Sequence, residues 1–390
     1  MLDSIYIGMS GLTGYSRGLK IISNNVANMN TPGFKASQLQ FSDLFYSGGG
    51  RGASRDGGMG LNTLSSNLNF GRGEFRQTGN NLDLAIDGDG LFVLRNEEGD
   101  TRYTRAGQFE FNADGVLVNR ADGAKVMGLD GSGRLTEIRI NNARNNAPKA
   151  SGNITFTGNL SGDDADHVID GIKVFDSVGG EHTLKVTFTN TSSTEAGTWS
   201  VVVHDGATQI ASGSVKFSNG LPAAGAGSLS FTYSPNGVPP LQLTLDLAAN
   251  VTSFAAGTTS TLAFATQDGF AAGVLTEVAV DEQGRLKLTY SNGQSTHDQR
   301  VALARFDSSA ALEQLGGNLF KSLDDGAMRY GAGGDDFGRV ASGVVELSNV
   351  DLSREFGDLI VTQRGYQASS QIISTANEMI QQLFDMKPRR

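Results

Sequence analysis

Apolar side chains recur every seven residues at both ends of this chain, and this repeat limits how the two ends can fold. The members of the repeat are Ile5, Leu12, Leu19 and Val26 near the N-terminus, and Leu352, Leu359, Tyr366, Ile373 and Ile380 near the C-terminus. Such spacing places apolar side chains on one stripe of an α-helix and is typical of a coiled-coil seam. It also fits two ordinary amphipathic helices packed on the body of the protein, and the spacing alone does not decide between them.

The predicted N-terminal helix carries several glycines, and each interior glycine costs about 1 kcal/mol relative to alanine. These are Gly8, Gly11, Gly14 and Gly18. Such a helix is marginal by itself and needs packing to form, while the missing side chains allow another backbone to come close. Both points favour a helix that becomes ordered on assembly, so we expect the ends of an isolated monomer to be mobile.

The helix is predicted to end in the stretch NNVANMNTPGFK, residues 24–35. Pro32 biases Thr31 away from helical backbone angles, and the asparagines and glycine tolerate turn geometry. The residues of this motif are Asn24, Asn25, Asn28, Asn30, Pro32, Gly33 and Phe34. A helix end followed by a turn explains the residue types, but it does not explain so dense a cluster of asparagines.

Between the ends the apolar period changes to two, which predicts half-buried β-strands. In 184–188 and 241–247 apolar residues alternate with polar ones, and Asp114-Gly115 predicts a hairpin turn between two short apolar runs. The Gly/Arg/Ser-rich stretch 48–60 predicts an irregular segment. A weak echo of the first β region after residue 269 suggests a nested chain, with one β domain interrupted by another.

We therefore predict a mainly β, multidomain chain with α-helical termini that pair as a coiled coil. The predicted domains are a terminal helical domain (1–30 plus 350–390), a linker (31–70), a discontinuous β domain (71–147 plus 270–349) and an inserted outer β domain (148–269). The inserted domain has the strand pattern of a sandwich or barrel with one solvated face.

The composition excludes several classes of function. The chain has 390 residues, no cysteine and a net charge of −10. The missing thiols exclude disulfides and thiolate metal sites, and the acidic balance argues against a nucleic-acid partner. No run of 18 apolar residues occurs, so we predict no membrane insertion. The first 30 residues lack the pattern of a cleaved signal peptide, which predicts that any export occurs without one.

No motif predicts a catalytic, cofactor-binding or metal site. The histidines show no ligand spacing, and a calcium loop beginning at Asp87 would place Phe92 where glycine is required. Asp87 and Asp89 are conceivable as the paired carboxylates of a glycosidase. A tight turn before an apolar strand explains them better, so we expect no enzyme activity, cofactor or metal.

Several stretches resemble the bacterial flagellar basal-body rod and hook proteins. MSGLTGYSRGLKIISNNVANMNTPGFK (9–35) resembles their N-terminal signature, and GVVELSNVDLSREFGDLIVTQRGYQASSQIISTANEMIQQL (343–383) resembles their C-terminal block. GRGEFRQTGNNLDLAIDGDGLFVL (71–94) and YTRAGQFEFNADGVLV (103–118) resemble the next block of the family. These stretches cover a little over a quarter of the chain, in the family's order. FTGNL (156–160) and IKVFDSVGGEHTLKVTF (172–188) resemble a middle domain found in the hook branch.

The resemblance implies a structural subunit of the flagellar hook. In this family the terminal helices pair as an inner tube around a channel, and the segment after NNVANMNTPGFK links that tube to outer domains. We expect many copies to form a curved, hollow, flexible tube that transmits torque from rod to filament and conducts exported subunits. The motif residues would form an assembly joint, and the two apolar repeats would bury against each other.

The resemblance also implies partners and a location. The expected partners are further copies of this chain, the flagellar rod, hook cap and hook–filament junction proteins, and the flagellar type III export apparatus. The expected location is extracellular, in the hook and basal body of the flagellum. The alternatives are a distal rod protein, which shares the ends but lacks the long middle domain, and a secreted β-rich enzyme or adhesin.

Overall fold

The structure of the protein is a computed structural model that describes residues 2–43, 60–324, 326 and 328–385. Within these residues the chain is mainly β with one long helix near each end, α1 (Leu2–Ala27) and α2 (Leu352–Asp385), which confirms the predicted fold class. Most of the predicted irregular stretch 48–60 lies outside the described residues. Two compact units contain the described residues of Met1–Asn141, Val278–Leu288 and Thr296–Arg390 (unit 1) and of Asn142–Glu277 and Thr289–Ser295 (unit 2).

The described strands are numbered in chain order. Those up to residue 146 are β1 (Ser37–Asp43), β2 (Leu61–Leu68), β3 (Phe75–Gln77), β4 (Leu84–Asp87), β5 (Leu91–Arg95), β6 (Thr101–Thr104), β7 (Phe109–Phe111), β8 (Leu117–Asn119), β9 (Lys125–Leu129), β10 (Leu135–Glu137) and β11 (Asn145–Asn146). Those between 153 and 267 are β12 (Asn153–Asn159), β13 (Asp166–Phe175), β14 (Glu181–Asn190), β15 (Thr198–Asp205), β16 (Thr208–Ser218), β17 (Leu221–Pro222), β18 (Ser228–Tyr233), β19 (Leu241–Asp246), β20 (Val251–Thr252) and β21 (Ala263–Gln267). The remainder are β22 (Gly273–Val280), β23 (Arg285–Tyr290), β24 (Ser295–Val301), β25 (Leu303–Phe306), β26 (Leu312–Gly316), β27 (Leu319–Ser322), β28 (Met328–Gly331), β29 (Arg339–Ser342) and β30 (Val344–Glu346).

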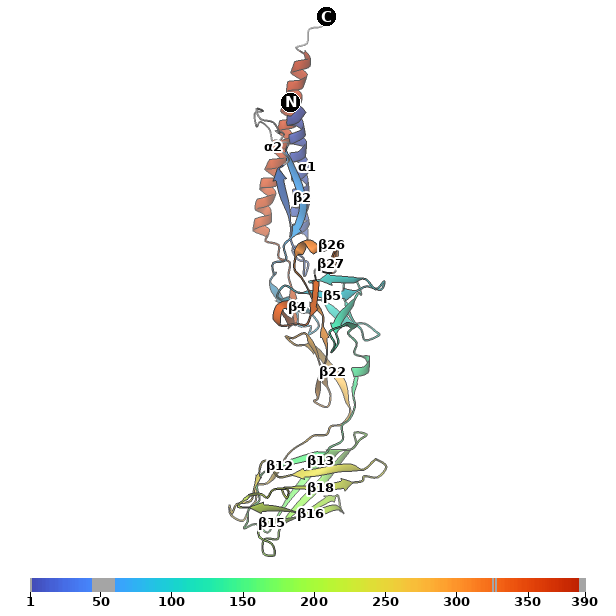
Figure 1. Ribbon diagram of the computed structural model, residues 1–390, viewed down its shortest axis with the longest axis vertical. Helices are drawn as coiled ribbons and strands as arrows, with labels where there is room; N and C mark the ends of the chain where they lie inside the picture. The colour runs from blue at the N-terminus through green and yellow to red at the C-terminus, as the bar shows by residue number, and fades with distance from the viewer. Residues whose placement is uncertain (1, 44–59, 325, 327, 386–390) are drawn as a thin grey trace. The chain divides into compact units, whose positions relative to one another are not determined.

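In unit 1 the two helices lie side by side and antiparallel, so that α1 begins and α2 ends at the same end of the pair (Figure 1). α2 begins at a side-chain cap, because the Asp351 carboxylate accepts hydrogen bonds from the backbone N–H groups of Ser353 and Arg354. Residues 31–70, predicted as a linker, contain the antiparallel pair β1–β2, whose register runs from Ser37 opposite Leu68 to Asp43 opposite Leu61. This hairpin packs on α1.

The β part of unit 1 brings together strands that are distant in sequence. β5 pairs with β25, β6 with β27, β4 with β29, and β3 with β30. The predicted hairpin is confirmed, since β7 and β8 pair around a turn in which Gly115 has φ 66°. One buried core includes Leu84, Phe92 and Phe109, whose rings and methyl groups are fully enclosed. These strand pairs join residues 71–147 to residues 270–349. The exact boundaries of the predicted domains stay a prediction.

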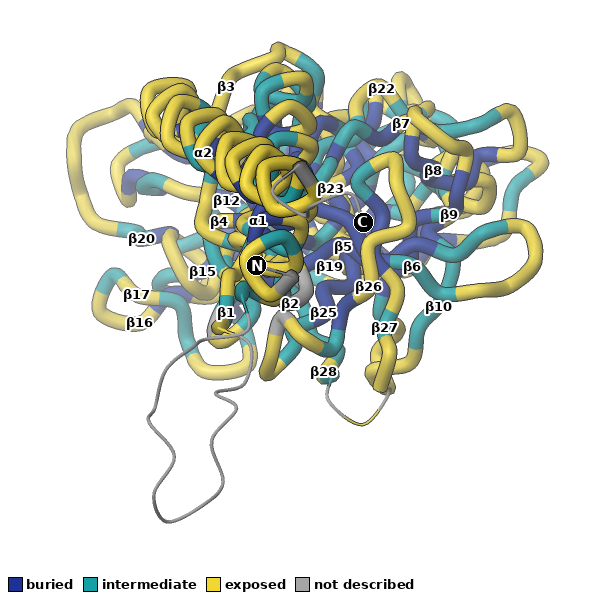
Figure 2. Tube along the Cα trace, turned by 90° about the horizontal axis from the view of Figure 1, so that it is seen from above, coloured by how far each residue is buried: buried dark blue, intermediate teal, exposed yellow. Residues whose placement is uncertain are grey.

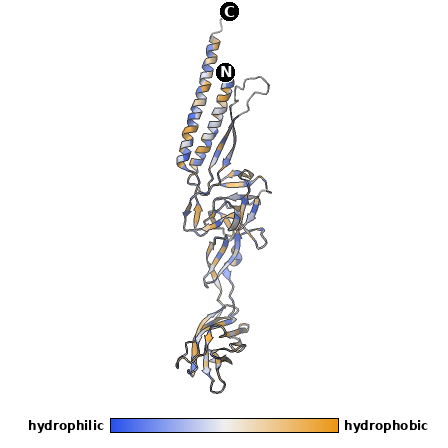
Figure 3. Cartoon of the chain, turned by 60° about the vertical axis from the view of Figure 1, so that its left-hand side comes forward, coloured by the Kyte–Doolittle hydropathy of each residue, from blue (hydrophilic) through white to orange (hydrophobic). Residues whose placement is uncertain are grey.

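Unit 2 holds two five-stranded sheets, β13-β14-β15-β16-β17 and β18-β19-β12-β20 with β21 beside β12. The alternation predicted for two of its strands is confirmed, because Leu184, Val186 and Phe188 of β14 and Leu243 and Leu245 of β19 are fully buried. They belong to one core shared by both sheets. In the colouring of Figure 3, apolar and polar segments alternate along both helices, and both kinds occur in the β units.

Candidate assembly site

The contact between α1 and α2 is built from small and polar side chains. Its central layers are Gly11 with Ser369, Gly18 with Thr362, and Asn25 with Glu355. A Cβ added to Gly11 would lie 2.6 Å from Ser369 Oγ. One added to Gly18 would lie 3.1 Å from Thr362 Cγ2. Each step of seven residues along α1 is matched by a step of seven backward along α2, and the glycines let the two backbones approach closely.

The residues of the predicted apolar repeat lie beside these central layers. Ile5, Leu12, Leu19, Val26, Leu359, Ile373 and Ile380 are half-buried, whereas Leu352 is 37 % and Tyr366 40 % exposed. Ile373 packs over Gly8, where an added Cβ would lie 2.7 Å from Ile373 Cγ1. The centre of the helix contact therefore falls on smaller side chains than the repeat predicted. The role of the apolar repeat in assembly stays a prediction.

The second side of α1 accepts the β1–β2 hairpin. A Cβ added to Gly14 would lie 2.5 Å from Leu61 Cδ1, so this glycine provides the space for the hairpin. Tyr15 contacts both neighbours, because its ring lies over Gly365 of α2 and 5.7 Å, between centroids, from the ring of Phe41. The glycines that weaken α1 as an isolated helix thus allow it to be packed on two sides.

Asn25 is the motif residue that joins three elements. Its side chain is 1 % exposed. Its Nδ2 donates to Ser37 O at 2.9 Å and to Glu355 Oε1 at 2.9 Å. Its Oδ1 accepts a hydrogen bond from Ser37 N at 3.0 Å. The amide therefore ties the last turn of α1 to the start of β1 and to the first turns of α2.

The remaining motif residues form the turn after α1. Asn28 Nδ2 donates to Asn24 O, and Thr31 Oγ1 donates to Asn28 Oδ1. Asn318 Nδ2 donates to Pro32 O at 2.9 Å, while Asn30 is exposed. Gly33 has φ 70°, and an added Cβ would lie 2.5 Å from Ala106 N, so no other residue fits here without a shift of the backbone. Phe34 is 3 % exposed.

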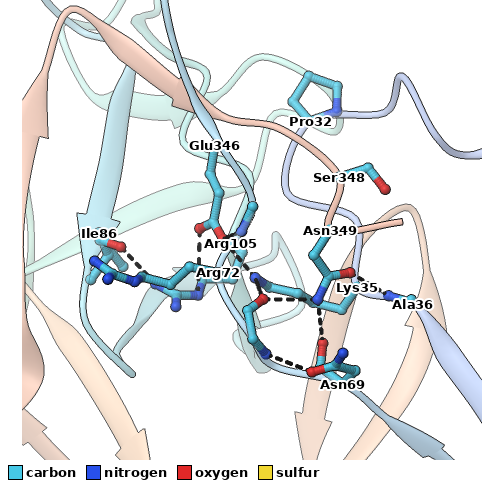
Figure 4. Close-up of polar contacts among 12 residues, drawn as sticks. Pro32, Lys35, Ala36, Asn69, Arg72, Ile86, Arg105, Glu346, Ser348 and Asn349 are labelled. Atoms are coloured by element: carbon cyan, nitrogen blue, oxygen red, sulfur yellow. Dashed lines mark hydrogen bonds and ion pairs between the residues drawn. The ribbon is translucent and has the colours of Figure 1, made fainter. Parts of the chain in front are cut away.

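A buried ion pair follows the turn directly (Figure 4). Lys35 Nζ lies 2.6 Å from Glu346 Oε1 on β30, and neither side chain is exposed. Lys35 Nζ also donates to Gly71 O at 2.9 Å, and Gly73 N donates to Glu346 Oε1 at 3.0 Å. Gly33 N donates to the backbone carbonyl of Glu346 at 2.8 Å. Residues 33–35, 71–73 and 346 are thereby held in one polar junction.

A second buried cation faces the same carboxylate. Arg105 Nε lies 3.7 Å from Glu346 Oε2, and Arg105 Nη1 donates to Ile86 O at 3.1 Å. Burial lowers the pKa of Lys35, and the attraction of Glu346 opposes this effect without overcoming it. Burial likewise lowers the pKa of Arg105. We call this group of contacts the Lys35–Glu346 junction. The negative charge of Glu346 balances the positive charges of Lys35 and Arg105 in it.

Asn349 closes the junction on the side of α2. Its Oδ1 accepts a hydrogen bond from Ala36 N at 2.8 Å. Its Nδ2 donates to Asn69 O at 2.7 Å and to Gly71 O at 2.8 Å. One side chain ahead of α2 therefore fixes both the beginning and the end of the segment that carries the β1–β2 hairpin.

Beside the motif lies an uncharged cavity of about 570 Å³. Its polar lining includes the amide side chains of Asn24, Asn28, Gln108, Asn119, Gln314 and Asn318. Among its lining residues in the described part of the chain, none carries a charged side chain. The asparagine cluster thus supplies a helix–strand clamp, a turn and part of this cavity.

Glu355 is a buried carboxylate at the centre of the helix contact. It is 7 % exposed, and burial raises its pKa, while the hydrogen bond from Asn25 acts in the opposite direction. The charged groups near it, Asp358, Arg354 and Asp351, all belong to α2 or its cap. Glu355 was not singled out by the sequence analysis, although it lies seven residues before Thr362 on the same face.

Asp87 and Asp89, the carboxylates considered for catalysis, each lie near an arginine. Among the described residues, no group of three or more histidine, aspartate or glutamate side chains is arranged to hold a metal ion. Asp87 ends β4 and pairs with the Arg72 guanidinium. Asp89 lies in the turn before β5, and its negative charge acts to raise the pKa of Arg105. In the part of the chain that is described, no helix is long and apolar enough to span a membrane.

Four family models match the chain in sequence order. The flagellar basal body rod protein model matches residues 5–35, and the flagellar hook protein FlgE/F/G D1 domain model matches residues 85–162. The flagellar basal body protein FlaE D2 domain model matches residues 168–270. The C-terminal model of the flagellar basal body rod FlgEFG proteins matches residues 341–386.

Curated relatives match over nearly the whole length. The flagellar hook protein FlgE of Salmonella typhimurium is 30 % identical over 413 residues, covering 97 % of this chain and 98 % of that protein. FlgE of Borreliella burgdorferi is 29 % identical over 445 residues, covering 99 % of this chain and all of that protein. The crystal structure of Helicobacter pylori FlgE2 is similar in fold, with a TM-score of 0.52 and 16 % identity over 70 % of this chain and 99 % of that one.

Proposed function

Since this chain belongs to the flagellar hook protein FlgE family, we propose that its paired terminal helices are the part of the subunit on which polymerisation depends. The chain is a structural subunit of the bacterial flagellar hook, and this family implies self-polymerisation. Our proposal adds that the copies form a curved, hollow and flexible tube. This tube acts as a universal joint, transmits torque from rod to filament and conducts exported subunits.

The observation that carries this proposal is that α2 is exposed over most of its length (Figure 2) and that many of its exposed residues are large and apolar. Its large exposed apolar residues are Leu352, Phe356, Ile360, Val361, Tyr366, Ile372, Met379, Leu383 and Phe384. Val361 is 69 % and Phe384 72 % exposed. These exposed apolar residues lie on two sides of α2; exposed apolar side chains grouped on one element indicate interaction sites, and in a homopolymer the partners that cover them are further copies of the same chain.

A polar stripe on the same helix supports the idea of a channel wall. Its members are Gln363, Gln367, Gln371, Asn377 and Gln381, and all are exposed. We propose that this stripe lines the channel of the tube. From Gln363 onward, a polar and weakly charged wall offers unfolded clients few apolar or ion-pairing side chains to which they could adhere, whereas Phe356 and Ile360 occupy the same heptad positions nearer the start of α2.

The proposed joint is the segment from Asn24 to Phe34 together with the Lys35–Glu346 junction. This segment connects the helix pair to the β part of unit 1 through buried hydrogen bonds and one buried ion pair. We further propose contacts with the rod, hook cap and hook–filament junction proteins, and export by the flagellar type III apparatus without a cleaved signal peptide. The role is structural, without catalysis, cofactor or metal. Nucleic acid and membrane insertion form no part of the proposal.

Two alternatives make different predictions. A distal rod protein would lack the inserted unit, whereas the D2 domain model matches residues 168–270. A secreted enzyme or adhesin would keep its activity without the terminal helices.

The test is a variant lacking residues 1–30 and 355–390, produced in cells that lack the native gene. We expect the variant to keep folded β units, measured by calorimetry, and to build no hooks. Hooks built by the truncated chain would contradict the proposal.

A further inference from the structure

The central layers of the α1–α2 contact are nearly equivalent to one another. Gly11 faces Ser369 and Gly18 faces Thr362, so that a glycine meets a small hydroxyl side chain in both layers. Sliding α2 by seven residues would place Gly11 against Thr362, or Gly18 against Ser369. Glycine accepts either partner, because it has no side chain with which to select one. These layers hold the helices close together, but they do not determine the register.

The next layer is different because both of its members are buried and polar. Asn25 is 1 % and Glu355 7 % exposed, and they are joined by a hydrogen bond of 2.9 Å. Asn25 is also held in place by two hydrogen bonds to the backbone of Ser37, so it cannot follow a sliding α2. In one slip Glu355 would face Gly18 and lose its donor, and in the other slip Asn25 would face Thr362, whose shorter hydroxyl side chain would replace the carboxylate. Buried polar groups without partners are strongly disfavoured.

We propose that Asn25 and Glu355 select the register of the terminal helix pair, acting beside the hydrogen bond from Ala36 N to Asn349 Oδ1 that holds the start of α2. A single buried polar residue among interchangeable layers is a known way to fix coiled-coil register. Here the polar layer is tied to β1 through Ser37, so the same contact places the helix pair relative to the β1–β2 hairpin.

Large side chains on the flank of the contact add to this selection but do not replace it. Tyr15 lies over Gly365, and a slip would bring Asp358 or Ile372 to that place. Tyr15 is only half-buried, so its ring can turn toward solvent. In the structure Ile373 packs over Gly8. A slip would place Tyr366 or Ile380 there instead, and both of these side chains are also large and apolar. In the enclosed polar layer, by contrast, a slip exchanges the hydrogen-bonded carboxylate for a shorter hydroxyl, or leaves the carboxylate against glycine.

The register matters for assembly because a slip of seven residues moves α2 by about 10 Å along its axis. The exposed apolar residues of α2 would then be displaced by that distance relative to the rest of unit 1. This consequence rests on the proposed function, in which those residues contact neighbouring copies. The register itself is a property of one chain and can be measured separately.

The test uses cysteine pairs, since the native chain contains no cysteine. Gly8→Cys combined with Ile373→Cys reports the register of the structure, because an added Cβ at Gly8 lies 2.7 Å from Ile373 Cγ1. Gly8→Cys combined with Tyr366→Cys or with Ile380→Cys reports a slip of seven residues in either direction. The variants are co-expressed as a minority with the native chain, so that hooks form in every sample. Crosslinks within one chain are recognised by faster migration on non-reducing denaturing gels.

With Asn25 and Glu355 intact, the Ile373 pair should crosslink at least about tenfold more than either slipped pair, as expected from the penalty on unpartnered buried groups. Glu355→Ala should raise a slipped pair to within about threefold of the Ile373 pair, because the polar selection is lost. Glu355→Gln keeps an acceptor for Asn25 and should preserve the preference. The inference would be overturned if Glu355→Ala kept the preference for the Ile373 crosslink. It would also be overturned if Glu355→Ala and Glu355→Gln lost that preference equally. Because hooks form in every sample, either outcome would leave the hook function unaffected.

Discussion

Lys35→Met should strongly destabilise unit 1, because the ion pair that it breaks is fully enclosed. Lys35 Nζ lies 2.6 Å from Glu346 Oε1, and both side chains have 0 % exposure. After the substitution Glu346 keeps a hydrogen bond from Gly73 N at 3.0 Å. Arg105 Nε lies 3.7 Å from the other carboxylate oxygen, too far for a hydrogen bond. The carboxylate would therefore lose its closest cation and keep only the more distant Arg105 charge and one backbone hydrogen bond.

The magnitude follows from the general behaviour of such pairs. Removing one partner of a buried ion pair costs about 3–5 kcal/mol. The lowered pKa of Lys35 shows that burial of its own charge is unfavourable, and the substitution relieves that cost. We therefore expect a loss near the lower end, about 3 kcal/mol. For a unit of roughly 150–250 residues this corresponds to a fall in Tm of about 6–12 °C.

Calorimetry of the monomer measures this effect, and the transition of unit 2 provides an internal reference. The matched control is Lys125→Met in the same unit. Lys125 Nζ lies 2.8 Å from Glu137 Oε1, but these side chains are 38 % and 22 % exposed. Exposed pairs contribute up to about 1 kcal/mol, so the control should shift Tm by no more than about 4 °C. A shift in Lys35→Met no larger than in the control would refute the reasoning.

Three further predictions concern the helix pair and the turn. Burial raises the pKa of Glu355 above 4.5, so the stability gained from its protonated form is lost as pH rises through the raised pKa. Glu355→Gln should therefore gain in urea stability relative to the native chain from acid to neutral pH, and a gain that shrinks over this range would count against it. Gly33→Ala should cost more than the approximately 1–2 kcal/mol of backbone strain, because an added Cβ lies 2.5 Å from Ala106 N. Gly123→Ala, with φ 71° and open space around it, should cost the strain alone, and equal losses in denaturant unfolding would contradict the clash. Val361→Asp should leave monomer stability within about 0.5 kcal/mol but abolish hooks in electron micrographs, and hooks of normal length would contradict the role of α2.

The periodic parts of the fold could be predicted from the sequence. The heptad spacing predicted the two helices, and strict alternation predicted β14 and β19, because burial of one face imposes a period on the sequence. The Asp114-Gly115 turn also predicted its hairpin correctly. The β1–β2 hairpin was missed, since the segment was predicted as a linker and its packing surface is provided by the glycines of α1.

The residues of the candidate site were harder to predict. Lys35 and Glu346 are separated by 311 positions, and no local pattern indicates that two charged residues so far apart form a buried pair. The centre of the helix contact was predicted on large apolar residues, although it falls on Gly11, Gly18 and Asn25. These three residues share the spacing of seven, which could have revealed them. Asn25 was predicted as part of a joint, but its contact with Glu355 depends on the tertiary fold.

The central claim is that this chain is the hook subunit, and electron microscopy of basal bodies from a strain with this gene deleted tests it most directly. The account predicts basal bodies that end in a complete rod, without hook or filament. Restoring the full chain should restore both. Basal bodies with normal hooks and filaments in the deleted strain would contradict the claim, and a shortened rod would place the chain in the rod instead.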